Sequence, residues 1–172
     1  MIKNISLLAA AALLPFAGSA FAEQGVTDTE VIIGACNDQS TPSGIRGKLL
    51  TWGAQAYYDH VNEKGGVHGR KIKLNSYDDA YEADKTIECF KKHIKEGIFA
   101  GAHFLGSPNA AKVSPLAEQN KLPVSGFISG AGFIYEPVKR YIFNLRASYE
   151  DATRIFVNRA WKELGYRRIA VI

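Results

Sequence analysis

Small residues able to bind a polar solute gather in the segments that follow the strand-like stretches of this chain. The set comprises Ser43, Ser107, Asn109, Ser129, Gly130 and Ala131. A serine hydroxyl both donates and accepts hydrogen bonds, and glycine lets a ligand approach the backbone closely. We therefore expect a ligand-binding site at these positions and assign no catalytic residue.

Ser107 stands at the expected start of a helix. The first backbone N–H groups of a helix have no partner within it, so they and the serine hydroxyl can together bind a carboxylate. The alternative is that Ser107 only caps the helix, which contributes about 1 kcal/mol to stability. The two roles are compatible.

Motifs typical of enzymes are missing from the sequence. There is no G-x-S-x-G turn, no P-loop and no G-x-G-x-x-G after the first strand-like segment. Adjacent Asp78 and Asp79 are expected to brace a loop, because neighbouring strand residues point to opposite faces. The histidines form no metal-binding pair: three (His60, His68, His93) fall on expected surface or turn positions, and His103 could face a cleft. We expect no enzyme, no metal and no cofactor.

Strand-like and helix-like segments alternate along the chain and must position these residues. The expected strands are residues 30–35, 71–77, 98–104, 124–128, 141–145 and 168–172; the expected helices are 47–64, 83–96, 110–120 and 150–164. This alternation predicts an α/β fold in which helices flank a parallel sheet. Ligands of such sheets bind outside the carboxyl ends of the strands.

The first 22 residues have the pattern of a signal peptide. Lys3 precedes an apolar run over residues 5–17, and Ala20-Phe21-Ala22 fits the small-residue cleavage rule. We expect an exported protein cleaved after Ala22. In that oxidising compartment Cys36 and Cys89 can form a disulfide or remain buried thiols, and both readings stay open.

Composition excludes several classes of protein. Of the 172 residues, 47% are hydrophobic and 22% are charged, which is typical of a globular protein and not of a disordered one. The net charge of +4 is spread without long basic runs, so we expect no nucleic-acid partner. The chain stops inside an apolar strand-like segment, and we expect it to be the N-terminal piece of a longer protein.

One stretch identifies a family resemblance. Residues 62–72 read N-E-K-G-G-V-H-G-R-K-I, and weaker matches lie at residues 25–30, 77–80, 115–118 and 162–165. In this order, behind a signal peptide, they resemble the periplasmic solute-binding proteins of ABC importers of the leucine/isoleucine/valine-binding type. The resemblance covers essentially the whole mature chain.

This resemblance implies a type I periplasmic-binding-protein fold of two lobes that close on a ligand. Residues 23–145 would form the first lobe and residues 146–172 the truncated start of the second. In the family, the serine matched by Ser107 and the turn matched by Ser129-Gly130-Ala131 hold an amino acid's carboxylate and ammonium groups. Gly132 stands where a threonine usually helps to bind the ammonium, so a carboxylate, amide or urea-like solute stays open.

The function expected from this resemblance is that of a periplasmic receptor in amino acid transport. It would bind a branched-chain amino acid or a similar small polar solute and deliver it to an inner-membrane ABC permease. Two alternatives remain: the ligand-sensing domain of a signalling receptor, and an exported α/β enzyme.

Overall fold

A five-stranded parallel sheet forms the centre of the chain. The computed structural model describes residues 23–170, so the expected signal peptide over residues 1–22 lies outside the described residues. The strands lie in the order β2-β1-β3-β4-β5. Their bounds are β1 Glu30–Asn37, β2 Lys71–Asp78, β3 Ala100–Ala102, β4 Val124–Ser125 and β5 Ile142–Phe143. All four neighbouring pairs are parallel, which confirms the expected fold class.

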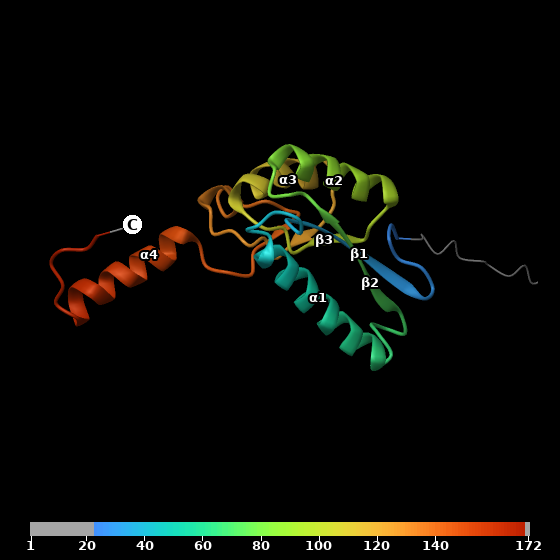
Figure 1. Cartoon of the computed structure of the whole chain (residues 1–172), viewed down its shortest axis with the longest axis horizontal. Coiled ribbons are helices and arrows are strands. Elements are labelled where there is room, and N and C mark those ends of the chain that lie inside the picture. Colours follow the sequence, from blue (N-terminus) through green and yellow to red (C-terminus); the bar gives the residue numbers. More distant parts are fainter. Residues whose placement is uncertain (1–22, 171–172) are drawn as a thin grey trace, which may run out of the picture.

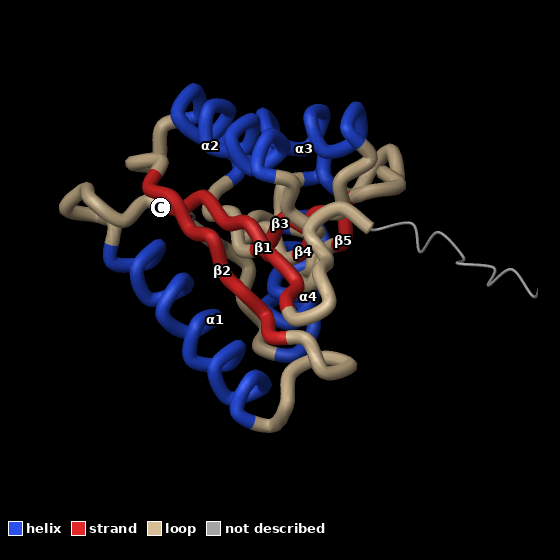
Figure 2. The backbone as a smooth tube through the Cα atoms, turned by 90° about the vertical axis from the view of Figure 1, so that its right-hand side faces the viewer, coloured by secondary structure: helices blue, strands red, loops and turns tan. Residues whose placement is uncertain are grey.

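Helices cover the two faces of the sheet unequally. They are α1 Ile45–Glu63, α2 Ala83–Glu96, α3 Ser107–Asn120 and α4 Tyr149–Asn158, with a 3₁₀ turn η1 Gly132–Ile134 and a π-helix η2 Arg159–Glu163. Helix α1 lies on one face, whereas α2 and α3 lie together on the other (Figures 1 and 2). Right-handed crossovers require this, because the chain steps from β1 to β2 in one direction and then returns past β1 to β3.

The apolar core lies between the sheet and the pair α2 and α3. Phe90 of α2 meets Phe104 edge-on at 5.7 Å, and Phe104 packs against Phe127 at the same distance. Strand β3 carries small residues because a side chain at Gly101 would lie 2.9 Å from the Phe104 ring. The sequence Ala-Gly-Ala therefore leaves room for the aromatic cluster.

The stretch that carried the family resemblance has a structural role. The Asn62 amide donates to the carbonyl oxygen of Ile72 (2.8 Å) and accepts from its backbone N–H (2.7 Å), which ties the end of α1 to β2. Gly65 follows with a positive φ of 99°, which ends the helix. The Arg70 Nε donates to the carbonyl oxygen of Thr27 at 2.7 Å.

Cys36 of β1 and Cys89 of α2 form a disulfide, with Cα atoms 6.3 Å apart. The structure thus decides between the two readings that the sequence left open. The bond ties β1 to the helix that packs on it. Within residues 23–170, no helix is long and apolar enough to cross a membrane.

The last segment differs from expectation. The helix expected at residues 150–164 is present as α4 and η2, and α4 extends away from the sheet (Figure 1). The strand expected at residues 168–172 is not formed over residues 168–170, and residues 171–172 lie outside the described part. A strand needs a hydrogen-bonding neighbour, and none of the described strands lies beside this segment.

Candidate ligand-binding site

The carboxyl ends of β1 and β3 enclose the candidate site. The strand order reverses between these two strands, which is where open α/β sheets bind ligands. A cleft of about 480 Å³ lies there, and its lining residues are Asp38, Ser43, Ile45, Arg46, Tyr81 and Leu105. The first turns of α1 and α3 begin at the same edge of the sheet, and neither has an acidic residue or a side-chain cap. Their N-termini therefore favour negative charge at this edge.

Ser107 and Ser129 are brought together from segments 22 residues apart, and their hydroxyl oxygens lie 2.8 Å from each other. The Ser129 Oγ also accepts the backbone N–H of Ala131 at 3.1 Å. Ser107 is the first residue of α3 and not its cap: the N-cap is Gly106, and no side chain caps the helix. The capping alternative for Ser107 is therefore wrong, because its hydroxyl faces Ser129 instead.

Gly106 is required at its position for two reasons. Its φ of 97° is one that side-chain-bearing residues rarely adopt, and a Cβ there would lie 2.4 Å from the Tyr81 ring. The Tyr81 side chain therefore packs on the residue just before Ser107. Tyr81 also lines the cleft that contains Ser43, whereas Ser107 and Ser129 are not among the lining residues of that cleft.

Asn109 and Ser43 differ in burial and are not part of the serine pair. Asn109 is fully buried, and its Nδ2 donates to the Asp79 carboxylate at 3.1 Å, so it supports the site from beneath. Ser43 is exposed on the cleft, and its hydroxyl lies 3.0 Å from that of Thr41. The structure thus brings Ser107, Ser129, Gly130 and Ala131 together, places Ser43 on the cleft that Tyr81 also lines, and leaves Asn109 in the core.

The Asp78-Asp79 pair braces its loop, as expected from the sequence. Asp78 accepts the backbone N–H groups of Gln39 and Ala80, and Asp79 accepts that of Tyr81 at 2.9 Å. Burial raises the pKa of Asp79, although hydrogen bonds from Tyr81 and Thr86 oppose that shift. Asp79 therefore connects Asn109 of α3 to the loop that carries Tyr81.

Two histidines lie at least partly inside the fold. His103, partly buried, bonds to the Tyr58 hydroxyl of α1 at 2.9 Å and does not line the cleft. His93 was expected at the surface, and this expectation is wrong: it is fully buried on the core side of α2, stacked on Tyr77 at 4.9 Å. The apolar positions of α2 set its buried face, and His93 lies on that face beside Phe90 and Cys89.

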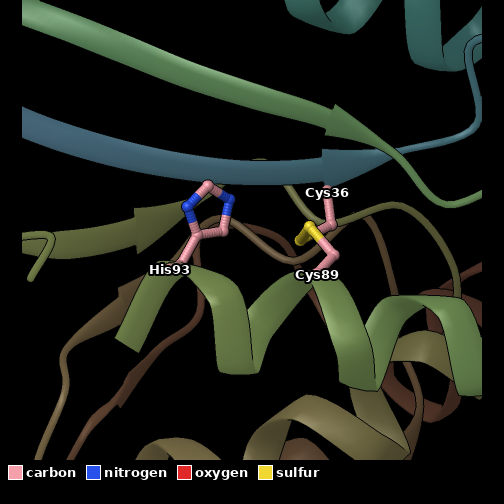
Figure 3. A group of neighbouring side chains, drawn as sticks. All are labelled: Cys36, Cys89 and His93. Carbon is pink, nitrogen blue, oxygen red and sulfur yellow. A yellow bond between two sulfur atoms is a disulfide. The ribbon is translucent and has the colours of Figure 1, made fainter. Parts of the chain in front are cut away.

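His93 and the disulfide form the one cluster of three candidate metal ligands within residues 23–170. The potential ligand atoms of Cys36, Cys89 and His93 lie within 4.8 Å of one another. Figure 3 shows Cys89 and His93 on the same face of α2, with the disulfide reaching up to β1. Metals bind thiolates, and both sulfur atoms here are already bonded to each other. This cluster is therefore part of the core.

Two residues at the site, Tyr81 and Tyr149, were not singled out by the sequence analysis. Tyr81 follows Asp79 closely in a loop. Only the packing of its ring on Gly106 shows that it belongs to the site. Tyr149 is the first residue of α4, and Ser148 before it caps the helix by accepting the Asp151 N–H. The Ser-Tyr-Glu-Asp pattern marks a helix start, but nothing in it indicates that Tyr149 contacts Gly130.

Comparison with known proteins gives the same class as the fold and the cleft. A family model described as periplasmic binding protein matches residues 30–172. The Leu/Ile/Val-binding protein homolog 1 of Brucella abortus is 29% identical over 119 residues, which are 69% of this chain and 30% of that protein. The Leu/Ile/Val-binding protein of Escherichia coli is 33% identical over 98 residues, 56% of this chain and 25% of that protein.

A solved structure of another substrate-binding protein has a similar fold. The fatty acid ABC transporter substrate-binding protein from Thermomonospora curvata superposes with a TM-score of 0.76 at 25% identity, over 85% of this chain and 36% of that one. In a parallel α/β sheet with a cleft at its switch point, that cleft is where ligands bind. The chain belongs to the periplasmic binding protein family. It spans about 30% of the length of the first curated relative.

Proposed function

We propose that this chain is the ligand-binding lobe of a periplasmic receptor that captures a small carboxylate-bearing solute for an ABC importer. The observation that carries the proposal is the Ser107–Ser129 pair at the start of α3, 2.8 Å apart. A hydroxyl beside an uncapped helix N-terminus suits an anionic oxygen. Paired hydroxyls of this kind can donate hydrogen bonds to a bound solute.

The names of the relatives support a carboxylate as the recognised group. The Brucella and Escherichia coli proteins are named for leucine, isoleucine and valine, and the Thermomonospora protein for fatty acids. These solutes differ in their apolar parts and in the amino group, but all carry a carboxylate. An amino acid or another small carboxylic acid is therefore the substrate class that we propose.

The rest of the proposal follows the family. Residues 23–145 would form the first lobe and residues 146–172 the start of a second, and the loaded receptor would dock on an inner-membrane permease. The protein would act in the periplasm after removal of residues 1–22, and it would catalyse no reaction. Export would be tested by mass spectrometry of the secreted chain, with Glu23 as the expected N-terminal residue.

Substitution of Ser107 tests the site. In the full-length gene product, Ser107→Ala should weaken binding of L-leucine or hexanoate by about 1–3 kcal/mol, or about 5- to 150-fold, because a hydrogen bond to a charged group is lost. Isothermal titration calorimetry measures the change. Ser114→Ala is the matched control, since this serine lies in the same helix and its buried hydroxyl has no partner among the described residues.

Two results would contradict the proposal. Unchanged affinity in Ser107→Ala would remove this serine from the site. A wild-type protein that binds neither amino acids nor small carboxylic acids would contradict the substrate class.

A further inference from the structure

Tyr149 lies directly on the turn that follows β4. Its backbone N–H donates to the carbonyl oxygen of Gly130 at 2.6 Å. A Cβ on Gly130 would lie 2.7 Å from the Tyr149 ring, so only glycine leaves room for the ring there. These contacts hold the first residue of α4 against the residue that follows Ser129.

The Tyr149 ring packs on Gly130, the residue that follows Ser129, and the Ser129 hydroxyl lies 2.8 Å from that of Ser107. Hydrogen bonding from the Ser107 hydroxyl, then from the Gly130 backbone, lowers the pKa of the Tyr149 phenol, with smaller contributions from the Arg146 charge and Ser129. Groups that lower the pKa of a phenol are those that stabilise a negatively charged oxygen. The region between Ser107 and Tyr149 therefore favours an anionic oxygen.

Ser107, Ser129 and Tyr149 differ in their exposure to solvent. Ser129 is fully buried, whereas Ser107 is partly exposed and Tyr149 is 48% exposed. Ser107 and Tyr149 are therefore the two of these residues that a solute can reach. Ser129, held by the Ala131 N–H, lies behind them and orients the Ser107 hydroxyl.

A positive charge, which would attract a carboxylate, lies beside Tyr149. The Arg146 guanidinium lies 5.3 Å from the centre of the Tyr149 ring. Among the described residues, no carboxylate lies within 4.0 Å of this guanidinium. Within the described residues, this guanidinium has no ion-pair partner, so it can attract a carboxylate bound at the two accessible hydroxyls.

We propose that Tyr149 is a ligand-binding residue whose hydroxyl, together with that of Ser107, binds the carboxylate of the solute. This inference rests on the proposed function and extends it, because it adds a contact from α4 to those made by the sheet and α3. The carboxylate is then held by groups from two segments that only the tertiary structure brings together. Tyr149 would also connect the bound solute to the position of α4.

A double-mutant cycle tests the contact. Calorimetric titration of L-leucine and of hexanoate would be compared for the wild-type full-length gene product, Tyr149→Phe, Ser107→Ala and the double variant. Tyr149→Phe should weaken binding of the recognised probe by about 2- to 12-fold, the scale of one hydrogen bond. The effects of the two substitutions should not be additive, because both hydroxyls contact the same group.

Tyr57→Phe is the matched control, since Tyr57 is 65% exposed on α1 and should leave binding unchanged. The unfolding midpoint of Tyr149→Phe should equal that of the wild type, because the ring that packs on Gly130 is retained. A weakened Ser107→Ala with an unchanged or tighter Tyr149→Phe would overturn the inference and leave the proposed function standing. A wild type that binds no carboxylate probe would overturn both.

Discussion

His93 shows how one residue is accommodated in the core. Its ring fits against β1 because Gly34 has no side chain: a Cβ there would lie 2.9 Å from the ring. The His93 Nε2 lies 3.1 Å from the carbonyl oxygen of Ala35, which can only accept, so this nitrogen carries the proton. The Nδ1 atom has no hydrogen-bond partner within the described residues and lies 3.7 Å from a Glu96 oxygen.

Burial of His93 predicts a loss of stability in mild acid. Burial lowers the pKa of His93 from 6.5, although the Ala35 hydrogen bond and Glu96 oppose the shift and Lys92 adds to it. Below pH 6.5 the unfolded chain takes up a proton that the folded chain does not. Stability should therefore fall between pH 7.5 and pH 5.5, by up to about 1.4 kcal/mol per pH unit for this group.

Urea unfolding at several pH values measures this loss. Burial also lowers the pKa of His103, so His103 contributes in the same direction. Replacing exposed His60 by Gln should leave the slope unchanged, whereas His93→Gln should reduce it. Equal slopes in wild type and His93→Gln would show that His93 does not titrate differently on folding.

At the scale of elements, the Cys36–Cys89 disulfide joins β1 to α2 across a sequence separation of 53 residues. A cross-link of this span restricts the unfolded chain and typically stabilises a protein by about 2–4 kcal/mol. We expect the double variant Cys36→Ala/Cys89→Ala to lose that amount. Denaturant unfolding of the variant and of wild type reduced by a dithiol should give the same shift. A change below about 1 kcal/mol would mean that the packing of α2 alone fixes this strand.

At the scale of the whole molecule, the described chain has a packed part and an exposed part. Helix α4 buries no residue, and several of its large side chains and those after it are at least 40% exposed: Ile155, Phe156, Val157, Trp161, Leu164, Tyr166 and Ile169. A second hollow, of about 410 Å³, lies beside β1 and β2 and is lined mainly by apolar residues such as Val31, Ile33 and Phe99. Exposed apolar surface of this kind favours association.

Limited proteolysis tests this division in the chain of residues 23–172. Cleavage should begin after about Leu145, because the backbone beyond it makes few contacts with the sheet, and a core of the preceding βα units should remain. Mass spectrometry of the early products locates the cuts. A segment after Leu145 that resists protease as long as the core does would contradict the prediction.

The sequence by itself determined the α/β class and the positions of most elements. An apolar run marks β1, alternation of polar and apolar residues marks β2, and glycines end α1 and α2; these local signals do not depend on distant residues. Phe156, Trp161 and Ile169, in the segment expected to begin a second lobe, are exposed. The short strands β3, β4 and β5 were placed correctly but overestimated in length, because apolar residues continue past the last paired residue.

Tertiary structure alone decided the pairings across the chain. Serine content indicated a polar site, but only the sheet order brings Ser107 to 2.8 Å from Ser129 and sets Tyr149 on Gly130. The disulfide and the burial of His93 likewise depend on which face of α2 meets β1. A one-dimensional pattern specifies which residues are near in the sequence, whereas crossovers between parallel strands decide which distant segments meet at the carboxyl edge.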